Sequence, residues 1–165
     1  MYRYVCFWDD SYSMGYTQKV KASRYRSLST EEFRDFLSSI KKHRPDLYDL
    51  VLWCTLAGWR LSDILDLKWS KIVDSPEGMV VDRTQLKTKN PLLFPIKMAM
   101  KEVLLRQKKN SKYVFGGQAD VSLTGQKLCR ICDTYGIKRV SFRELRPTFA
   151  THRINTGTPL IFLKN

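Results

Sequence analysis

Residues 56–69 constrain the fold more than any other stretch, because they predict two helices that meet at an elbow. An apolar helix runs into this stretch and ends at Gly58, a residue suited to the left-handed conformation that often follows a helix. A short amphipathic helix then begins at Ser62, with Ile64 and Leu65 on its apolar face. The chain must therefore bury apolar side chains on both sides of the elbow.

Arg60 lies between these two helices, with apolar residues before and after it. A guanidinium group held there suits a planar, doubly charged oxygen acceptor such as phosphate. The N-terminus of the second helix adds partial positive charge beside it. A simpler interpretation is that Arg60 caps the helix end or pairs with Asp63, and the local sequence alone favours this simpler interpretation.

The composition is that of a globular protein with a basic surface. The 165 residues fit one domain, and 43% of them are hydrophobic. Lys and Arg number 29 against 16 Asp and Glu, a net charge of +13, which favours a polyanionic partner such as nucleic acid. Ribosomal or membrane-surface binding would explain the charge equally well. No stretch reaches membrane-spanning length and the N-terminus does not resemble a signal peptide, so we expect a cytoplasmic protein without a membrane span.

The cysteine spacing leaves a metal site open but does not favour it. Cys129 and Cys132 have the spacing of half a zinc site, yet no second Cys or His pair follows. Cys132 also shares helical spacing with Leu128 and Ile131, so we expect it in the core and predict no metal.

Periodic apolar residues predict a mainly α protein with a small three-stranded antiparallel sheet (α+β). A capping box at Ser29 and Glu32 begins the first helix, which residues 41–43 close. Further helices are predicted over residues 46–57, 62–69, 97–109 and 122–135, and strands over residues 71–73, 79–86 and 92–96. Residues 1–26 lack a period and are interpreted as a linker or the remnant of a preceding DNA-binding domain.

Two further basic segments are candidates for a site. The turn between the second and third strands carries Lys87 and Lys89, and a hairpin tip can present a lysine to a ligand. A solubilising basic turn is the more common case. Farther on, Arg143 and Arg146 lie three residues apart, on one face of a helix. Pro147 conflicts with a continuous helix from Ser141, so the helix either kinks there or begins at Arg146.

The order of these segments resembles the catalytic domain of tyrosine recombinases, the phage integrase family, over residues 27–165. Residues 57–69 (Ala-Gly-Trp-Arg-Leu-Ser-Asp-Ile-Leu-Asp-Leu-Lys-Trp) resemble the family's first box. Residues 86–89 (Leu-Lys-Thr-Lys) resemble its Lys-Thr hairpin, and residues 143–152 (Arg-Glu-Leu-Arg-Pro-Thr-Phe-Ala-Thr-His) resemble its second box, His-x-Leu-Arg-(His)-Thr-Phe-Ala-Thr.

The resemblance implies site-specific recombination of double-stranded DNA through a 3′-phosphotyrosine link. Arg60 and Arg146 would hold the non-bridging oxygens of the scissile phosphate. Lys87, or Lys89 if the hairpin tip shifts, would protonate the leaving 5′-oxygen. Asp63 would orient the site. The family needs neither a metal nor another cofactor, and its members act in phages or mobile elements with other recombinase subunits on DNA.

This sequence departs from the family pattern at two points. Arg143 stands where the family usually has His, and arginine does not exchange protons near neutral pH. It could still donate hydrogen bonds to phosphate, so it remains a candidate site residue. None of the tyrosines occupies the nucleophile position, since the last, Tyr135, precedes the second box. We therefore expect a catalytic domain that is incomplete at its C-terminus, binds DNA and does not cleave it.

Two alternatives remain open. The chain could be a non-catalytic or decayed DNA-binding relative of an integrase. It could also be a basic helical protein that binds RNA or the ribosome, in which case nothing requires the arginines of the two boxes to converge on one pocket.

Overall fold

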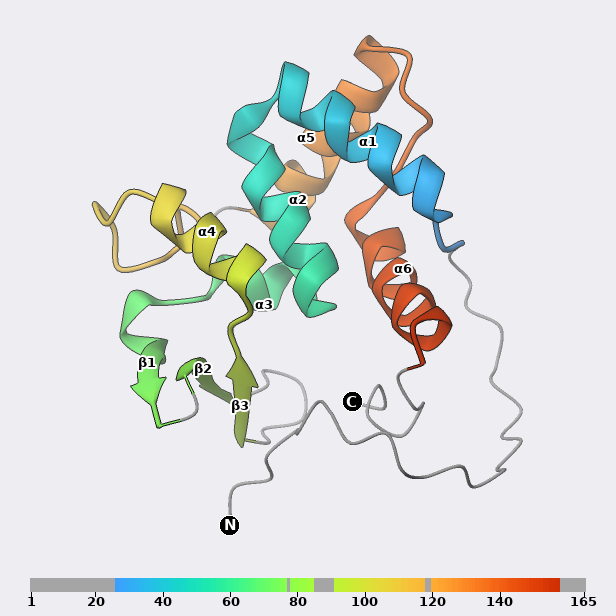
Figure 1. Ribbon diagram of the computed structural model, residues 1–165. Coiled ribbons are helices and arrows are strands. Elements are labelled where there is room, and N and C mark those ends of the chain that lie inside the picture. The colour runs from blue at the N-terminus through green and yellow to red at the C-terminus, as the bar shows by residue number, and fades with distance from the viewer. Residues whose placement is uncertain (1–25, 77, 85–90, 118–119, 158–165) are drawn as a thin grey trace.

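The computed structural model describes residues 26–76, 78–84, 91–117 and 120–157 (Figure 1). Its elements in chain order are α1 (Thr30–His43), α2 (Pro45–Ala57), α3 (Leu61–Leu65), the 3-10 helix η1 (Trp69–Lys71), β1 (Ile72–Ser75), β2 (Gly78–Thr84), β3 (Pro91–Pro95), α4 (Met98–Arg106), α5 (Val121–Thr134) and α6 (Phe142–Asn155).

A small sheet lies at one edge of a helical body. The strands follow the order β1-β2-β3, and both pairings are antiparallel, with Val81 of β2 opposite Ile72 of β1 and Phe94 of β3. In Figure 1 the sheet lies below α3 and α4, and α6 lies on the other side of α2. This architecture confirms the predicted α+β class with a three-stranded antiparallel sheet.

Helix α2 is the centre of the core because apolar residues surround most of its axis. It contacts α1, α3, α4 and α6. Trp53 is fully buried and packs edge-on against Trp59 and Phe115, with ring centroids 6.3 and 5.4 Å away. Burying an aromatic ring of this size stabilises a fold by several kcal/mol, about 3–5 when the ring is deleted to alanine. Cys132 is also buried in the core, as predicted.

The second predicted helix begins one residue earlier than expected, because Pro45 is its first residue rather than a break before it. Helix α3 is shorter than predicted and ends at Leu65 instead of near Trp69. The reason is a non-local interaction: Lys68 forms a β-bridge with Tyr113, and the Leu67 carbonyl accepts a hydrogen bond from the Val114 N–H. These contacts draw the chain away from the helix.

Helix α6 includes Pro147, so of the two alternatives predicted for this segment the start at Arg146 is ruled out. The hydroxyl of Thr148 donates a 2.6 Å hydrogen bond to the Glu144 carbonyl, which supports the backbone beside the proline. Residues 1–25 lie outside the described residues, as do residues 158–165, where Thr158 followed by Pro159 predicts the start of a further helix. None of the described helices is both long and apolar enough to cross a membrane.

A charged network at the start of α1 ties it to the segment before α6. The Glu32 carboxylate accepts hydrogen bonds from the Ser29 N–H, the Arg26 guanidinium and the Lys138 ammonium group. The Lys138 hydrogen bond, the Ser29 N–H and the two positive charges lower the pKa of Glu32 to about 2. The capping box predicted at Ser29 is confirmed.

This low pKa predicts that the contribution of Glu32 to the stability of the fold depends on pH in the acid range. In the unfolded chain Glu32 has a pKa of roughly 4.3, the value of a free Glu side chain. In the folded protein its pKa is about 2, so the carboxylate stays ionised to a lower pH. The stabilising effect of Glu32 is therefore complete above that unfolded pKa and is lost as the pH falls toward 2. We expect the difference in melting temperature between the wild type and Glu32→Gln, measured by circular dichroism, to shrink across this window. A difference that stays constant from pH 6 to pH 2.5 would contradict the network.

Candidate functional site

The elbow between α2 and α3 is held by buried aromatic packing. Gly58 ends α2 in the left-handed conformation (φ 65°), and the next residue, Trp59, is buried edge-on against Trp53 and Phe94. The backbone of Arg60 is extended, and its carbonyl accepts hydrogen bonds from the N–H groups of the first turn of α3. Burial of Trp59 leaves the neighbouring Arg60 side chain exposed to solvent.

The first turns of α6 present the other two arginines of the predicted site. Phe142, Leu145 and Thr148 are buried on the core side of the helix. Arg143 is exposed and Arg146 is half-buried on a different side. The Glu144 carboxylate accepts hydrogen bonds from the Ser141 N–H and hydroxyl, at 2.7 and 2.9 Å, which stabilises the helix start.

A close approach of two helices brings the elbow and α6 together. A Cβ atom built on Gly58 would lie 2.4 Å from Cδ1 of Phe149, well inside van der Waals contact. Gly58 therefore serves twice: it adopts the positive φ that ends α2, and it leaves room for the Phe149 ring. Phe149 lies one turn after Arg146, so this contact relates the positions of Arg60 and Arg146.

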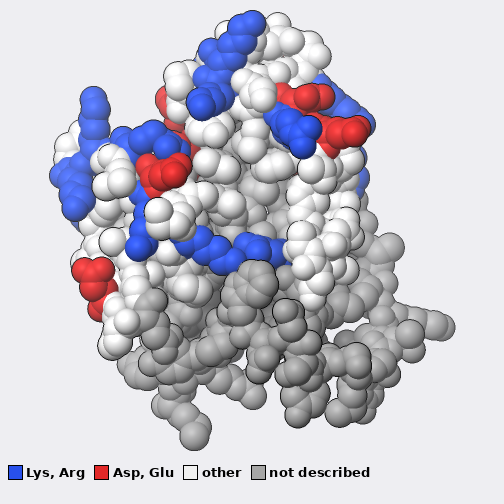
Figure 2. Space-filling view, viewed as in Figure 1, with Lys and Arg blue, Asp and Glu red and all other residues white. Residues whose placement is uncertain are grey.

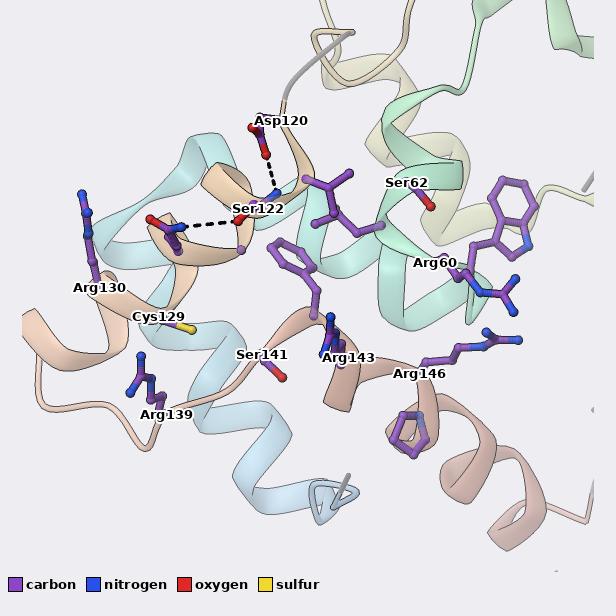
Figure 3. A pocket seen from close by; sticks show the side chains of 17 residues that line it. Arg60, Ser62, Asp120, Ser122, Cys129, Arg130, Arg139, Ser141, Arg143 and Arg146 are labelled. Carbon is purple, nitrogen blue, oxygen red and sulfur yellow. Dashed lines mark hydrogen bonds between the residues drawn. The ribbon is translucent and has the colours of Figure 1, made fainter. Parts of the chain in front are cut away.

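Arg60, Arg143 and Arg146 all line one pocket of about 1180 Å³. Figure 3 shows Arg60 and Arg146 extending in the same direction from the elbow and from α6, with Arg143 beside them at the start of α6. This volume exceeds a single phosphate group and is large enough for a segment of a polymer. Guanidinium groups on one wall make the pocket suited to an anion with several oxygens.

Positive charge continues beyond the pocket wall. The Arg153 guanidinium lies 5.4 Å from the centre of the Phe149 ring. Partial burial and the positive charge of Arg153 lower the pKa of Lys97, so these two cations repel each other. Figure 2 shows Lys and Arg side chains in a band across the middle of one face of the molecule. A polyanion bound beside Lys97 and Arg153 would relieve the repulsion between them.

Of the remaining predicted site residues, Asp63 does not line the pocket, and the two lysines lie outside the described residues. Asp63 is half-buried on α3 and is not among the pocket-lining residues; its N–H donates a hydrogen bond to the Arg60 carbonyl. Lys87 and Lys89 lie outside the described residues. Among the tyrosines in the described ranges, none lines the pocket.

Helix α5 supplies a wall of the pocket that sequence reasoning missed. The helix contributes six lining residues: Val121, Ser122, Gly125, Gln126, Cys129 and Arg130. Arg139, from the connection to α6, lines the same wall, and a hydrogen bond to Cys129 together with the charge of Asp133 raises the pKa of Arg139. Helical spacing opposite Leu128 and Ile131 could have identified the polar face of α5, but not that it borders a pocket.

The cysteines show no metal-binding arrangement in the part of the chain that the structure describes. There, no cluster of three or more His, Cys, Asp or Glu side chains could hold a metal ion.

Solved structures with the same fold include lambda integrase and the Tn1549 transposon integrase. A DNA-bound lambda integrase is 18% identical with a TM-score of 0.69 over 87% of this chain and 56% of that chain. The lambda integrase catalytic core is also 18% identical with a TM-score of 0.69, over 84% of this chain and 88% of that chain. The Tn1549 transposon integrase in complex with circular intermediate DNA is 14% identical, with a TM-score of 0.66 over 88% of this chain and 58% of that chain.

This chain therefore spans little more than half of the DNA-bound lambda and Tn1549 proteins but most of the lambda catalytic core. A comparison with curated proteins gives no match. The sequence model of the phage integrase family matches residues 26–165, which include both arginine-bearing segments. The chain belongs to the phage integrase family and has the fold of a tyrosine recombinase catalytic domain.

Proposed function

We propose that this protein takes part in site-specific DNA recombination, and that its arginine pocket binds a phosphate of double-stranded DNA. The observation that supports this proposal best is the convergence of Arg60, Arg143 and Arg146 on one pocket. A protein that binds RNA through a diffuse basic surface has no need of such convergence. Solved relatives bound to DNA as a dimer and as a tetramer support duplex DNA and other recombinase subunits as partners.

In the proposed chemistry, the pocket stabilises charge rather than transferring protons. A tyrosine oxygen attacks the phosphorus, and the bond from phosphorus to the 5′-oxygen breaks. Arg60 and Arg146 donate hydrogen bonds to the non-bridging oxygens as negative charge develops on them. Lys87 donates the proton to the leaving 5′-oxygen, with Lys89 as the alternative, and Asp63 orients the elbow.

Arg143 changes what this pocket offers compared with the family pattern. A histidine at that position would exchange protons near neutral pH, whereas a guanidinium group stays protonated. We propose that Arg143 acts as a third hydrogen-bond donor to the phosphate. The pocket would then hold a phosphate with three fixed positive charges, which favours tight binding of the anion over acid–base catalysis.

The alternative is a DNA-binding relative without catalytic activity. The Arg at position 143, where the family usually has His, favours it. Both functions require binding of DNA in the host cytoplasm, so they differ only in the covalent step.

A polypeptide of residues 1–165 should bind duplex DNA without forming a covalent link to it. No tyrosine follows the second box in this polypeptide, and the described tyrosines lie away from the pocket. Incubation with suicide substrates, in which the cleaved strand cannot be rejoined, followed by denaturing electrophoresis, should show free DNA only. A covalent adduct that disappears in an Arg60→Ala variant would instead show that one of these tyrosines is the nucleophile.

A further inference from the structure

The segment of residues 26–29, here called the N-terminal strap, is bonded along one face of α6. The Arg26 Nε atom donates a 3.0 Å hydrogen bond to the Glu144 carboxylate. Leu28 is buried, and its N–H donates to the Thr148 hydroxyl at 3.0 Å. The Leu28 carbonyl lies 3.0 Å from Nε2 of His152. Glu144, Thr148 and His152 are each four residues apart, so they form one stripe on the helix.

This stripe spans Pro147 in the middle of α6. Pro147 has no N–H, so residue 147 cannot donate the usual helical hydrogen bond toward residue 143, which leaves a gap in the backbone ladder of α6. Glu144 lies on one side of this gap, whereas Thr148 and His152 lie on the other. The strap therefore makes hydrogen bonds to residues on both sides of Pro147 and fixes the orientation of the two halves of the helix relative to each other.

Among the described residues of α6, those that line the pocket lie in the first half and at Pro147, whereas the second half contacts the elbow. Arg143 and Arg146 precede Pro147 in the first half. Phe149, in the second half, packs against Gly58 and thus against the elbow that positions Arg60. A change of the helix at Pro147 would move Arg146 relative to Arg60. The contacts of the strap across the gap oppose this change.

We propose that the N-terminal strap is a positioning element of the phosphate pocket, and that Glu144 and Thr148 act as positioning residues for Arg146. This proposal rests on the proposed function of the pocket. None of the three strap-bonding residues of α6 (Glu144, Thr148 and His152) lines the pocket. In this proposal they affect the binding of the anion only through the position of Arg146.

Removing the Glu144 charge separates positioning from simple electrostatics, because the two accounts predict opposite signs. Glu144→Gln deletes a negative charge near the pocket, which by electrostatics alone should tighten DNA binding. If Glu144 positions Arg146, binding weakens instead, by about threefold. The matched control is Asp49→Asn, which deletes a carboxylate that pairs with Arg106 at 2.7 Å. The control should leave DNA affinity unchanged or slightly improved.

The measurement is fluorescence anisotropy of a short labelled duplex with the 165-residue chain, below the melting temperature of every variant. The effect of Glu144→Gln should shrink to less than about 1.5-fold in an Arg146→Ala background, since it acts through that arginine. An equal loss in both backgrounds, or affinity at or above that of Asp49→Asn, would overturn the proposal. Equal binding by the wild type and Arg146→Ala would overturn the proposed function of the pocket, and the strap proposal with it.

A second pair of variants covers the case in which Glu144→Gln does not fold. Thr148→Val keeps the shape of the side chain but deletes the hydroxyl that accepts from Leu28, whereas Thr148→Ser keeps that hydroxyl. Thr148→Val should weaken DNA binding about threefold, again only when Arg146 is present. Thr148→Ser should retain wild-type affinity. Equal affinity of the two variants would contradict the positioning role.

Discussion

Replacement of Gly58 by alanine should destabilise the protein by about 3 kcal/mol, because two costs add at this residue. A side chain at positive φ costs about 1–2 kcal/mol. The new Cβ would also lie 2.4 Å from the Phe149 ring, and forced overpacking costs roughly 1–3 kcal/mol. For a domain of this size, the melting temperature should fall by about 6–12 °C.

Gly136 is the matched control for this experiment. It also has a positive φ, 62°, but nothing lies within 4 Å of the position of its Cβ. Gly136→Ala should therefore lower the melting temperature by about 2–8 °C, less than Gly58→Ala does. In thermal unfolding followed by circular dichroism, equal losses for the two variants would show that the Phe149 contact is unimportant. Adding Phe149→Leu to Gly58→Ala should recover part of the stability, since it relieves the overlap.

Loss of both Arg60 and Arg146 should weaken DNA binding more than any other pair of substitutions considered for the pocket. Arg60→Ala alone should cost about tenfold in affinity, a modest effect because we expect many other cations of this basic chain to contact the DNA backbone. Arg146→Ala should cost about the same. If both hold one phosphate, the double variant should lose roughly thirtyfold rather than the hundredfold expected of independent contacts.

Arg34→Ala is the control for lost charge in this titration. Arg34 is exposed on α1 and is not among the pocket-lining residues, yet its removal changes the net charge by the same amount. Anisotropy titrations should give this variant nearly wild-type affinity. A tenfold loss for Arg34→Ala as well would mean that net charge, not the pocket, determines the affinity.

Local patterns in the sequence predicted most of the helices because their determinants lie within a few residues. The bonds between Ser29 and Glu32 that begin α1 span three residues, so the capping box could be recognised directly. The spacing of Arg143 and Arg146 likewise placed them at the start of one helix. The elbow at Gly58 followed from the composition of the stretch around it.

The errors arose where distant contacts decide the structure. Helix α3 ends early because Lys68 pairs with Tyr113, which is 45 residues away in the chain. Helix α6 continues through Pro147, supported on both sides by bonds to residues near the N-terminus. No local pattern contains either contact.

The pocket was only half predictable for the same reason. The motifs identified Arg60, Arg143 and Arg146, and the structure brings these three together. The wall formed by α5, with Arg130 and Arg139, depends on how α5 packs against α3. Periodicity shows which face of a helix is polar, but tertiary packing determines what that face borders.

The salt dependence of DNA binding tests most directly whether Arg60 and Arg146 hold the same phosphate. The logarithm of the binding constant falls with the logarithm of salt concentration, with a slope of about −0.9 for each phosphate that the protein neutralises. The wild type, both single variants and the double variant should be titrated from low to physiological salt. A shared phosphate predicts a slope reduced by about 0.9 in the double variant, with affinity losses that are less than multiplicative. A reduction of about 1.8 with fully multiplicative losses, or no reduction at all, would contradict the shared phosphate on which the proposed function depends.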